Sequence, residues 1–195
     1  LTADITVNSG VIDSNGNLAS DTTGFMQWTP MGTSDKPYKG IFDGQGHKIS
    51  GLYFNTPSIQ YVGFFGRIGT GTIKNLGVVD SYFLGNQYVG AICGYSVNGI
   101  ISGCYSISAV YGEYGCGGIC GTNDSGAITN CCSNSDIGPL DAVGSYYDDS
   151  RITNTISKTT DEFERGVAAY VLNGGESPAV WGQEIGVDKL PVFGG

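Results

Sequence analysis

The chain has 195 residues, carries a formal net charge of −9 and contains only 14% Asp, Glu, Lys and Arg. Its few Lys and Arg residues are scattered singly, so no basic patch is present to displace counterions from phosphates, and we expect no binding to nucleic acid. No apolar run approaches the roughly 20 residues of a membrane-spanning helix, so no direct membrane insertion is expected.

Residues 1–36 predict an irregular capping region with a little β structure. The alternation of apolar and polar residues over 3–7 indicates a strand. The segment 11–18 indicates a hairpin that turns on Asn15 and Gly16, where a positive φ costs little.

Asp13, Asn15 and Asn17 within that hairpin imitate the start of a calcium-binding loop. However, Leu18 stands where such a loop needs glycine, and Gly24 stands where it needs a bidentate Glu. We therefore predict a simple turn.

Residues 37–156 repeat themselves. Four glycines are evenly spaced along this part of the chain: Gly63, Gly90, Gly117 and Gly144. Around the first three the sequence reads Tyr-Val-Gly-Phe-Phe-Gly, Tyr-Val-Gly-Ala-Ile-Cys-Gly and Cys-Gly-Gly-Ile-Cys-Gly, and a Gly-x-Ile block recurs at a similar interval. Such periods signal stacked units that bury a core only against their neighbours.

Each unit contains two alternating apolar runs and a shorter third, long enough at about 3.3 Å per residue for one three-sided turn of a solenoid. Hairpin signals are missing between the units, so we expect equivalent strands to stack in parallel. The predicted fold is an all-β, right-handed parallel β-helix (a β-solenoid) with coils of about 27 residues, the interval of the repeated glycines.

The six cysteines follow the repeat. Cys93 and Cys120 occupy equivalent positions, as do Cys104 and Cys131. In a parallel stack such residues lie about 4.8 Å apart and face the same interior, where Cys behaves as a small hydrophobe. We predict reduced core ladders rather than disulfides, and no zinc site, because no second ligand pair joins Cys116 and Cys120.

Residues 157–195 predict a C-terminal cap. Thr159 to Glu162 has the spacing of a capping box, and a short helix over about 160–172 follows and stops at Asn173. Its apolar face is predicted to comprise Phe163, Val167, Tyr170 and Val171. We expect this helix to cover the open end of the stack, completed by terminal strands with Trp181, Val187, Leu190 and Val192.

Several blocks resemble a known family. The segment 40–52, which reads Gly-Ile-Phe-Asp-Gly-Gln-Gly-His-Lys-Ile-Ser-Gly-Leu, and the Tyr-Val-Gly-x-x-x-Gly and Gly-x-Ile-x-Asn-Cys blocks are similar to the GLUG-motif repeat proteins of bacteria. The opening and closing segments of those proteins resemble residues 1–5, 28–32, 161–163, 172–175, 181–183 and 190–192. The resemblance implies an exported or cell-surface, adhesin-like β-helical module, monomeric within a larger bacterial protein. It transfers no catalytic residue and no cofactor.

An enzyme is one alternative, because β-helices also host polysaccharide lyases and hydrolases. Fragments of a polygalacturonase-like set occur at His47, Asn123, Asp124, Asp148, Asp149 and Arg151. His47 precedes the carboxylates by about three coils, roughly 15 Å, so the set is not expected to converge on one sugar. We predict no catalytic residue and a structural, hydrogen-bonded role for His47. Asp141, with Asp148 and Asp149, is predicted to solvate a turn rather than to bind calcium.

The twelve tyrosines supply the binding candidates. Tyr61 and Tyr88 lie one repeat apart and predict a structural stack. The candidate binding residues lie near predicted corners and loops: Tyr82, Tyr95, Tyr111 and Tyr114. Packing on the flank of the domain is the alternative for each of them.

Three hypotheses for function follow from these observations. The first is a non-catalytic binding module for a host or bacterial glycan or protein. The second is a structural spacer of a larger surface protein, and the third is a polysaccharide-processing enzyme.

Overall fold

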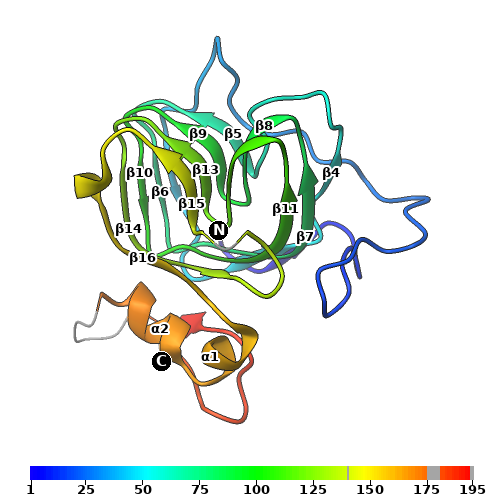
Figure 1. The fold of residues 1–195 in the computed structure, drawn as a ribbon. Helices are drawn as coiled ribbons and strands as arrows, with labels where there is room; N and C mark the ends of the chain where they lie inside the picture. The colour runs from blue at the N-terminus through cyan, green and yellow to red at the C-terminus, as the bar shows by residue number, and fades with distance from the viewer. Residues whose placement is uncertain (140, 175–180, 194–195) are drawn as a thin grey trace.

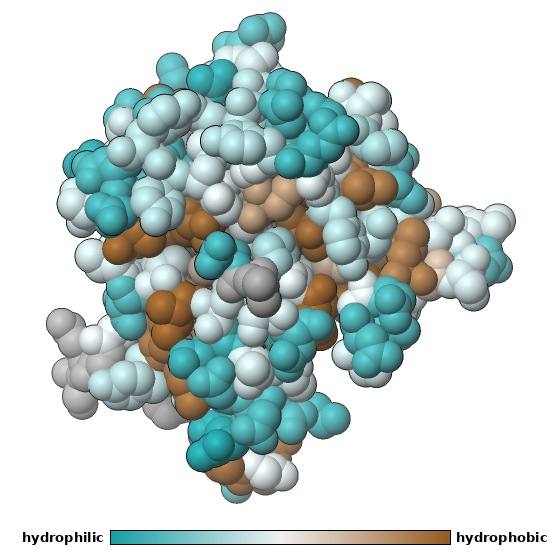
Figure 2. All heavy atoms as spheres, in the orientation of Figure 1, coloured by the Kyte–Doolittle hydropathy of each residue, from teal (hydrophilic) through white to brown (hydrophobic). Residues whose placement is uncertain are grey.

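The computed structural model describes residues 1–139, 141–174 and 181–193. Most of the chain is wound into a parallel β-solenoid of about four turns, seen along its axis in Figure 1. The predicted fold class is confirmed. Figure 2 shows that this face is hydrophilic around its rim, while hydrophobic residues gather toward the middle of the coil.

Three walls form the solenoid. One wall contains, in order along the axis, β1 (Ile5–Thr6), β3 (Lys48–Ser50), β7 (Gly77–Leu84), β11 (Tyr105–Tyr111), β14 (Ala127–Asn134) and β16 (Ile152–Lys158). The second contains β2 (Ile41–Asp43), β6 (Thr72–Lys74), β10 (Ile100–Ser102) and the first half of β14. The third contains β5 (Phe65–Ile68), β9 (Cys93–Ser96), β13 (Cys120–Asn123) and β15 (Val143–Tyr146). At the corners, β4 (Tyr53–Asn55) pairs with β7, and β8 (Gln87–Gly90) pairs with β12 (Tyr114–Gly117).

The strand register explains the repeat length. Cys93 pairs with Cys120, and Ile101 pairs with Ile128, so equivalent residues of successive repeats lie side by side. Between β7 and β11, the paired residues from Tyr105 to Ile107 are one position further apart in the sequence than the repeat interval. The regular interval returns at Ser108, after an irregularity between Ile107 and Ser108. A β-bulge of this kind absorbs an extra residue without breaking the ladder.

The interior of the solenoid is an apolar core. Successive coils contribute Ile73, Ile101 and Ile128, each fully buried, and Phe65 is fully buried on the opposite wall. Burial of such side chains contributes about 1.5–3 kcal/mol each, so the stacked coils supply most of the stability.

The cysteine ladders are confirmed. All six cysteines are free. Cys93, Cys104, Cys120 and Cys131 are fully buried in the core. The thiols of Cys104 and Cys131 lie 3.4 and 3.2 Å from the carbonyl oxygens two residues earlier. Burial raises the pKa of the Cys93 and Cys104 thiols well above its usual value, so these groups stay protonated.

The N-terminal segment closes one end of the stack. The predicted strand is present as β1, which pairs with β3, and the predicted hairpin is present because Ile12 bridges Leu18. The carboxylate of Asp13 accepts hydrogen bonds from the backbone of the next residues in the turn, at 2.8 and 2.9 Å. Further along, Met31 bridges Phe65 and the ring of Tyr38 lies 4.7 Å from the Phe65 ring.

The C-terminal segment differs from the prediction in its helix. Instead of one helix over 160–172, it forms α1 (Thr160–Glu164) and α2 (Val167–Leu172). Gly166 separates them with a left-handed φ of 82°, which resets the helical phase. Consequently Tyr170, predicted on the apolar face, is 69% exposed, while Ala168 and Leu172 are buried.

The position of this cap also corrects the prediction. The helices do not cover the end of the stack; Figure 1 shows them beside the coil. They pack on the outer face of the first wall, where Phe163, Leu172 and Trp181 meet Tyr105 and Cys132.

The short β17 (Trp181–Gly182) pairs antiparallel with β18 (Val192–Phe193). Trp181 is buried and Leu190 packs beside it, but Val187 and Val192 are 68% and 40% exposed. An apolar patch on the outside of the coil therefore determines where the cap packs.

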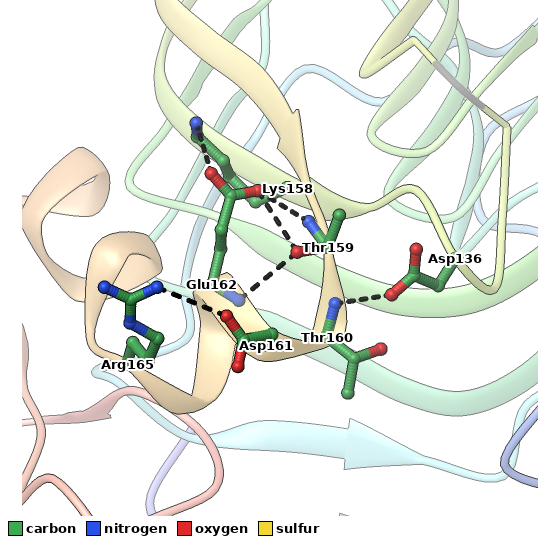
Figure 3. A network of polar contacts seen from close by, with 7 residues as sticks. All are labelled: Asp136, Lys158, Thr159, Thr160, Asp161, Glu162 and Arg165. Carbon is green, nitrogen blue, oxygen red and sulfur yellow. Dashed lines mark hydrogen bonds and ion pairs between the residues drawn. The ribbon is translucent and has the colours of Figure 1, made fainter.

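A polar network fixes the start of the cap (Figure 3). The Glu162 amide donates to the Thr159 hydroxyl at 3.3 Å, and the Thr159 amide donates to the Glu162 carboxylate at 2.9 Å, which confirms the predicted capping box. Lys158 donates to the other Glu162 oxygen at 2.9 Å. This hydrogen bond is the main cause of a lowered pKa of Glu162. The Thr160 amide donates to Asp136 at 2.7 Å, which ties the cap to the turn after β14.

Replacement of Thr159 by alanine is expected to lower the free energy of unfolding by about 1 kcal/mol, because an N-cap hydroxyl satisfies an otherwise unpaired helix amide. Urea denaturation followed by circular dichroism measures the loss. Thr70→Ala, at an exposed loop position, is the matched control and should be close to neutral. Equal effects of the two substitutions would show that the capping box does not stabilise the cap.

Candidate functional site

The four candidate tyrosines fall into two separate clusters. Tyr82 and Tyr111 belong to a tyrosine ladder with Tyr53, on the outside of β4, β7 and β11. Tyr95 and Tyr114 belong to a second group with Tyr61, Tyr88 and Arg67, which we call the tyrosine–arginine cluster. The structure therefore brings the candidates together in pairs and not as one site.

The tyrosine ladder is a packed outer row. The ring centroids of Tyr53 and Tyr82 are 6.4 Å apart, those of Tyr82 and Tyr111 are 5.5 Å apart, and Phe25 packs edge-on against Tyr53. Burial raises the pKa of Tyr82, and the two neighbouring tyrosines add to the effect. Tyr111 is 44% exposed where the row ends. None of these three tyrosines lines either of the two hollows described below.

The tyrosine–arginine cluster contains the predicted stack. Tyr61 and Tyr88 lie with centroids 5.2 Å apart and ring planes at 16°. Tyr95 meets both rings edge-on, at 5.9 and 5.1 Å, and Tyr114 meets Tyr88 edge-on at 6.3 Å. Tyr114 is 58% exposed, so the cluster reaches the surface. Burial, and then the charge of Asp124, raise the pKa of Tyr95 to about 12, so its hydroxyl remains a hydrogen-bond donor.

Arg67 holds the cluster in place. Its guanidinium carbon lies 5.7 Å from the Tyr61 centroid and 5.3 Å from the Tyr95 centroid, which is cation–π geometry. One guanidinium nitrogen donates to the carbonyl oxygen of Ser34 at 3.4 Å. Within the part of the chain that the structure describes, no ion pair joins Arg67 to a carboxylate. The arginine therefore links the tyrosines to the N-terminal loop.

The backbone of the stacked tyrosines is unusual. Tyr61 and Tyr88 adopt φ values of 63° and 59°, in the left-handed region that bulky residues rarely occupy. The equivalent residue of the next coil is Gly115, with a φ of 62°. Strain of this kind costs about 1–3 kcal/mol per residue and gathers at functional sites. The sequence signal for this backbone is the glycine at the same repeat position in the next copy, because glycine is the residue typical of a positive φ.

A groove adjoins the cluster at Tyr61. It has a volume of about 580 Å³ and lies between the loop after residue 26 and the loop after β4. Its lining comprises Gln27, Trp28, Thr29, Pro30, Gly32, Thr33, Ser34, Phe54, Thr56, Ile59, Gln60 and Tyr61. No side chain in this lining is charged. Aromatic rings with neutral amides and hydroxyls are the groups that suit an uncharged polar ligand.

The groove walls are held by local contacts. Trp28 stacks on Phe64, with centroids 5.2 Å apart and planes at 20°, and its indole N–H donates to the Phe64 carbonyl at 3.2 Å. The Gln27 side-chain amide donates to the Thr56 hydroxyl at 2.9 Å across the groove. Sequence reasoning missed this site, because Trp28 belongs to the irregular segment and only the stacking of that segment on the first coil brings it beside Tyr61.

His47 does not meet the other polygalacturonase-like fragments. His47 precedes β3, and Asp148 precedes β16, with β7, β11 and β14 between them in the same wall. Four strand spacings separate the two residues by about 19 Å along the axis. His47 contacts the Asp4 carboxylate at 3.2 Å, the hydrogen-bonded role that was predicted. Asp148 caps the 3₁₀ helix η1 (Asp149–Arg151), and Arg151 donates to the Ser125 carbonyl at 2.7 Å.

A second hollow, of about 800 Å³, lies in the last coil between β15 and β16, and Asp141, Tyr146 and Asp149 are among its lining residues. Among the residues described, no three His, Cys, Asp or Glu side chains are grouped so that they could hold a metal ion. None of the helices in the described ranges is both long enough and apolar enough to cross a membrane.

Comparison with known proteins gives two partial similarities. A protein named Gly-rich membrane protein from Evansella cellulosilytica is 34% identical over 56 residues, which are 28% of this chain and 6% of that protein. Halomucin from Haloquadratum walsbyi is 32% identical over 114 residues, which are 58% of this chain and 1% of that protein. The chain thus spans a small fraction of the length of these relatives. No protein-family model matches the chain. No solved structure matches it.

Proposed function

We propose that this chain is a non-catalytic, surface-displayed binding module that recognises a glycan through the groove beside Tyr61. The observation that carries the proposal is the groove lining, which combines Trp28 and Tyr61 with the neutral side chains of Gln27, Thr33 and Gln60. Aromatic side chains contact sugars through their rings or edges, while amides and hydroxyls, including the phenol of Tyr61, exchange hydrogen bonds with sugar hydroxyls.

The same lining argues for binding without catalysis. Glycoside hydrolysis generally uses a pair of carboxyl groups that flank the scissile bond, and the groove lining contains no Asp or Glu. The carboxylates of the polygalacturonase-like set lie outside the groove, after β13 and before β16. The names of the two partial relatives, one called a membrane protein and the other after mucins, support a bacterial or archaeal surface location for the larger protein.

Replacement of Tyr61 by glycine is expected to weaken glycan binding about tenfold or more, because it removes one of the three aromatic side chains that line the groove. Glycine suits the left-handed backbone at this position, as Gly115 shows in a later coil, so the fold should be retained. A glycan array identifies the ligand, and isothermal titration calorimetry measures the affinity. Tyr53→Ala, in the tyrosine ladder, is the matched control and should bind as the unmodified chain does. Equal losses in the two variants would contradict a site at the groove.

The second candidate function is a structural spacer of a larger surface protein. It is favoured by the small share of each relative that this chain covers, 6% and 1%. Binding measured on the glycan array and on a parallel panel of extracellular-matrix proteins distinguishes a binding module from a spacer. A module that binds no glycan and no protein on these panels would be a spacer, and a module that binds proteins alone would overturn the glycan proposal.

A further inference from the structure

We infer that the glycan is an unbranched, uncharged polysaccharide that lies along the solenoid axis, with successive sugar units on successive coils. This inference rests on the proposed function and specifies its ligand. Three observations carry it: the spacing of the aromatic residues, the distribution of charge and the rigidity of the surface.

The aromatic residues advance coil by coil. Trp28 belongs to the segment before the first coil, and Tyr61, Tyr88 and Tyr114 follow on three successive coils. Trp28 and Tyr61 line one groove, Tyr61 stacks on Tyr88 at 5.2 Å, and Tyr114 meets Tyr88 at 6.3 Å. Each coil advances about 4.8 Å along the axis, close to the length that one sugar ring adds to an extended chain. A single sugar can contact one or two of these residues, whereas a chain can contact them all.

The orientation of the rings indicates how they are used. Tyr61 and Tyr88 stack face to face, so their edges and hydroxyls are the parts left for a ligand. The hydroxyls of these two tyrosines and of Tyr114 make no hydrogen bond to the described part of the chain. A row of unpaired phenol hydroxyls can hydrogen-bond to a row of sugar hydroxyls.

The charge distribution selects an uncharged chain. The groove lining contains no charged residue, and Arg67, the cation of the adjoining cluster, is engaged by Tyr61, Tyr95 and the Ser34 carbonyl. The whole chain carries a net charge of −9, which repels polyanions such as uronate or sulfated polysaccharides.

The surface is preorganised. The left-handed backbone of Tyr61 and Tyr88 and the cation–π contacts of Arg67 fix the rings before a ligand arrives. A fixed row of contacts favours a ligand with a regular, extended shape, because little conformational entropy is lost at the protein surface on binding.

Calorimetric titration with oligosaccharides of one to six units tests the inference. The uncharged probes are β-1,4-linked chains of glucose, mannose, xylose or N-acetylglucosamine, and oligogalacturonides of the same lengths are the charged probes. For at least one uncharged series we expect the affinity to rise with each added unit up to about four units, one for each aromatic position, and then to level off. Oligogalacturonides should bind at least about tenfold more weakly.

Tyr114→Ala provides the internal check. It should abolish the gain in affinity between three and four units, because Tyr114 lies at the far end of the row. Tyr111→Ala, an exposed tyrosine of the ladder, is the matched control. Equal affinity for one and four units, or tighter binding of oligogalacturonides or of branched glycans, would overturn the inference and leave the proposed function standing. If no glycan of any kind binds, both fail.

Discussion

Replacement of Phe65 by alanine is expected to lower the free energy of unfolding by about 3–5 kcal/mol, the loss typical of a buried phenylalanine. Phe65 is fully buried at the junction between the N-terminal segment and the first coil. Its ring centroid lies 4.7 Å from that of Tyr38, 5.6 Å from that of Phe42 and 4.9 Å from that of Phe64. The cavity would therefore weaken the closed end of the solenoid as well as its core.

Urea denaturation measures this loss as a shift in the transition midpoint at an unchanged slope. Phe65→Leu should recover most of the stability, because leucine refills much of the space. Phe25→Ala, whose ring packs edge-on against Tyr53 at an incompletely buried position, is the matched control and should lose far less. A loss at Phe65 no larger than at Phe25 would show that the N-terminal segment does not close the core.

Replacement of Gly90 by alanine is expected to cost about 1–3 kcal/mol or more, the range for forced overpacking. A methyl group at Gly90 would overlap the backbone carbonyl of Cys93 and the backbone amide of Gly121 in the next coil. Backbone atoms cannot move aside without separating the coils. The same crowding occurs at Gly117, one repeat later, and it explains why glycine recurs at this interval.

Gly69→Ala is the matched control for this second effect. A methyl group there would make ordinary contacts of 3.4 Å or more with Pro37 and Lys39 side chains, so the variant should be close to neutral. Thermal unfolding of both variants by calorimetry gives the comparison. If Gly90→Ala were as stable as Gly69→Ala, the repeating glycines would not be explained by the approach of neighbouring coils.

The repeat could be read from the sequence because stacking depends on local and periodic features. Glycine at Gly63, Gly90 and Gly117, and the ladder of Cys93 on Cys120, follow directly from the constant interval of the repeat. The capping box at Thr159 was equally visible, because a helix start is a local event.

The position of the cap could not be read in this way. Tyr105 and Cys132 form an apolar patch on the outside of the coil, but strands with apolar residues on both faces give no sign of which face a later segment covers. The break at Gly166 also changed which side chains of the helices became buried, so that Tyr170 turned outward.

Part of the candidate site could be predicted from the sequence. Tyr95 and Tyr114 do belong to the cluster beside the groove, whereas Tyr82 and Tyr111 belong to the tyrosine ladder. Tyr61 was assigned to a structural stack and is both stacked and exposed to the groove. The site depends on contacts between an irregular segment and the first repeat, and such contacts leave no periodic trace.

In our proposal, the ligand binds where the irregular N-terminal segment meets the repeat, at the groove between Trp28 and Tyr61. Titration of the isotope-labelled chain with the uncharged oligosaccharide that binds best, followed by NMR, tests it most directly. We expect the resonances of the Trp28 indole N–H and of the Gln60, Tyr61 and Tyr88 amides to shift first and to saturate together. Shifts centred instead on the tyrosine ladder around Tyr82, or on the hollow between β15 and β16, would contradict it.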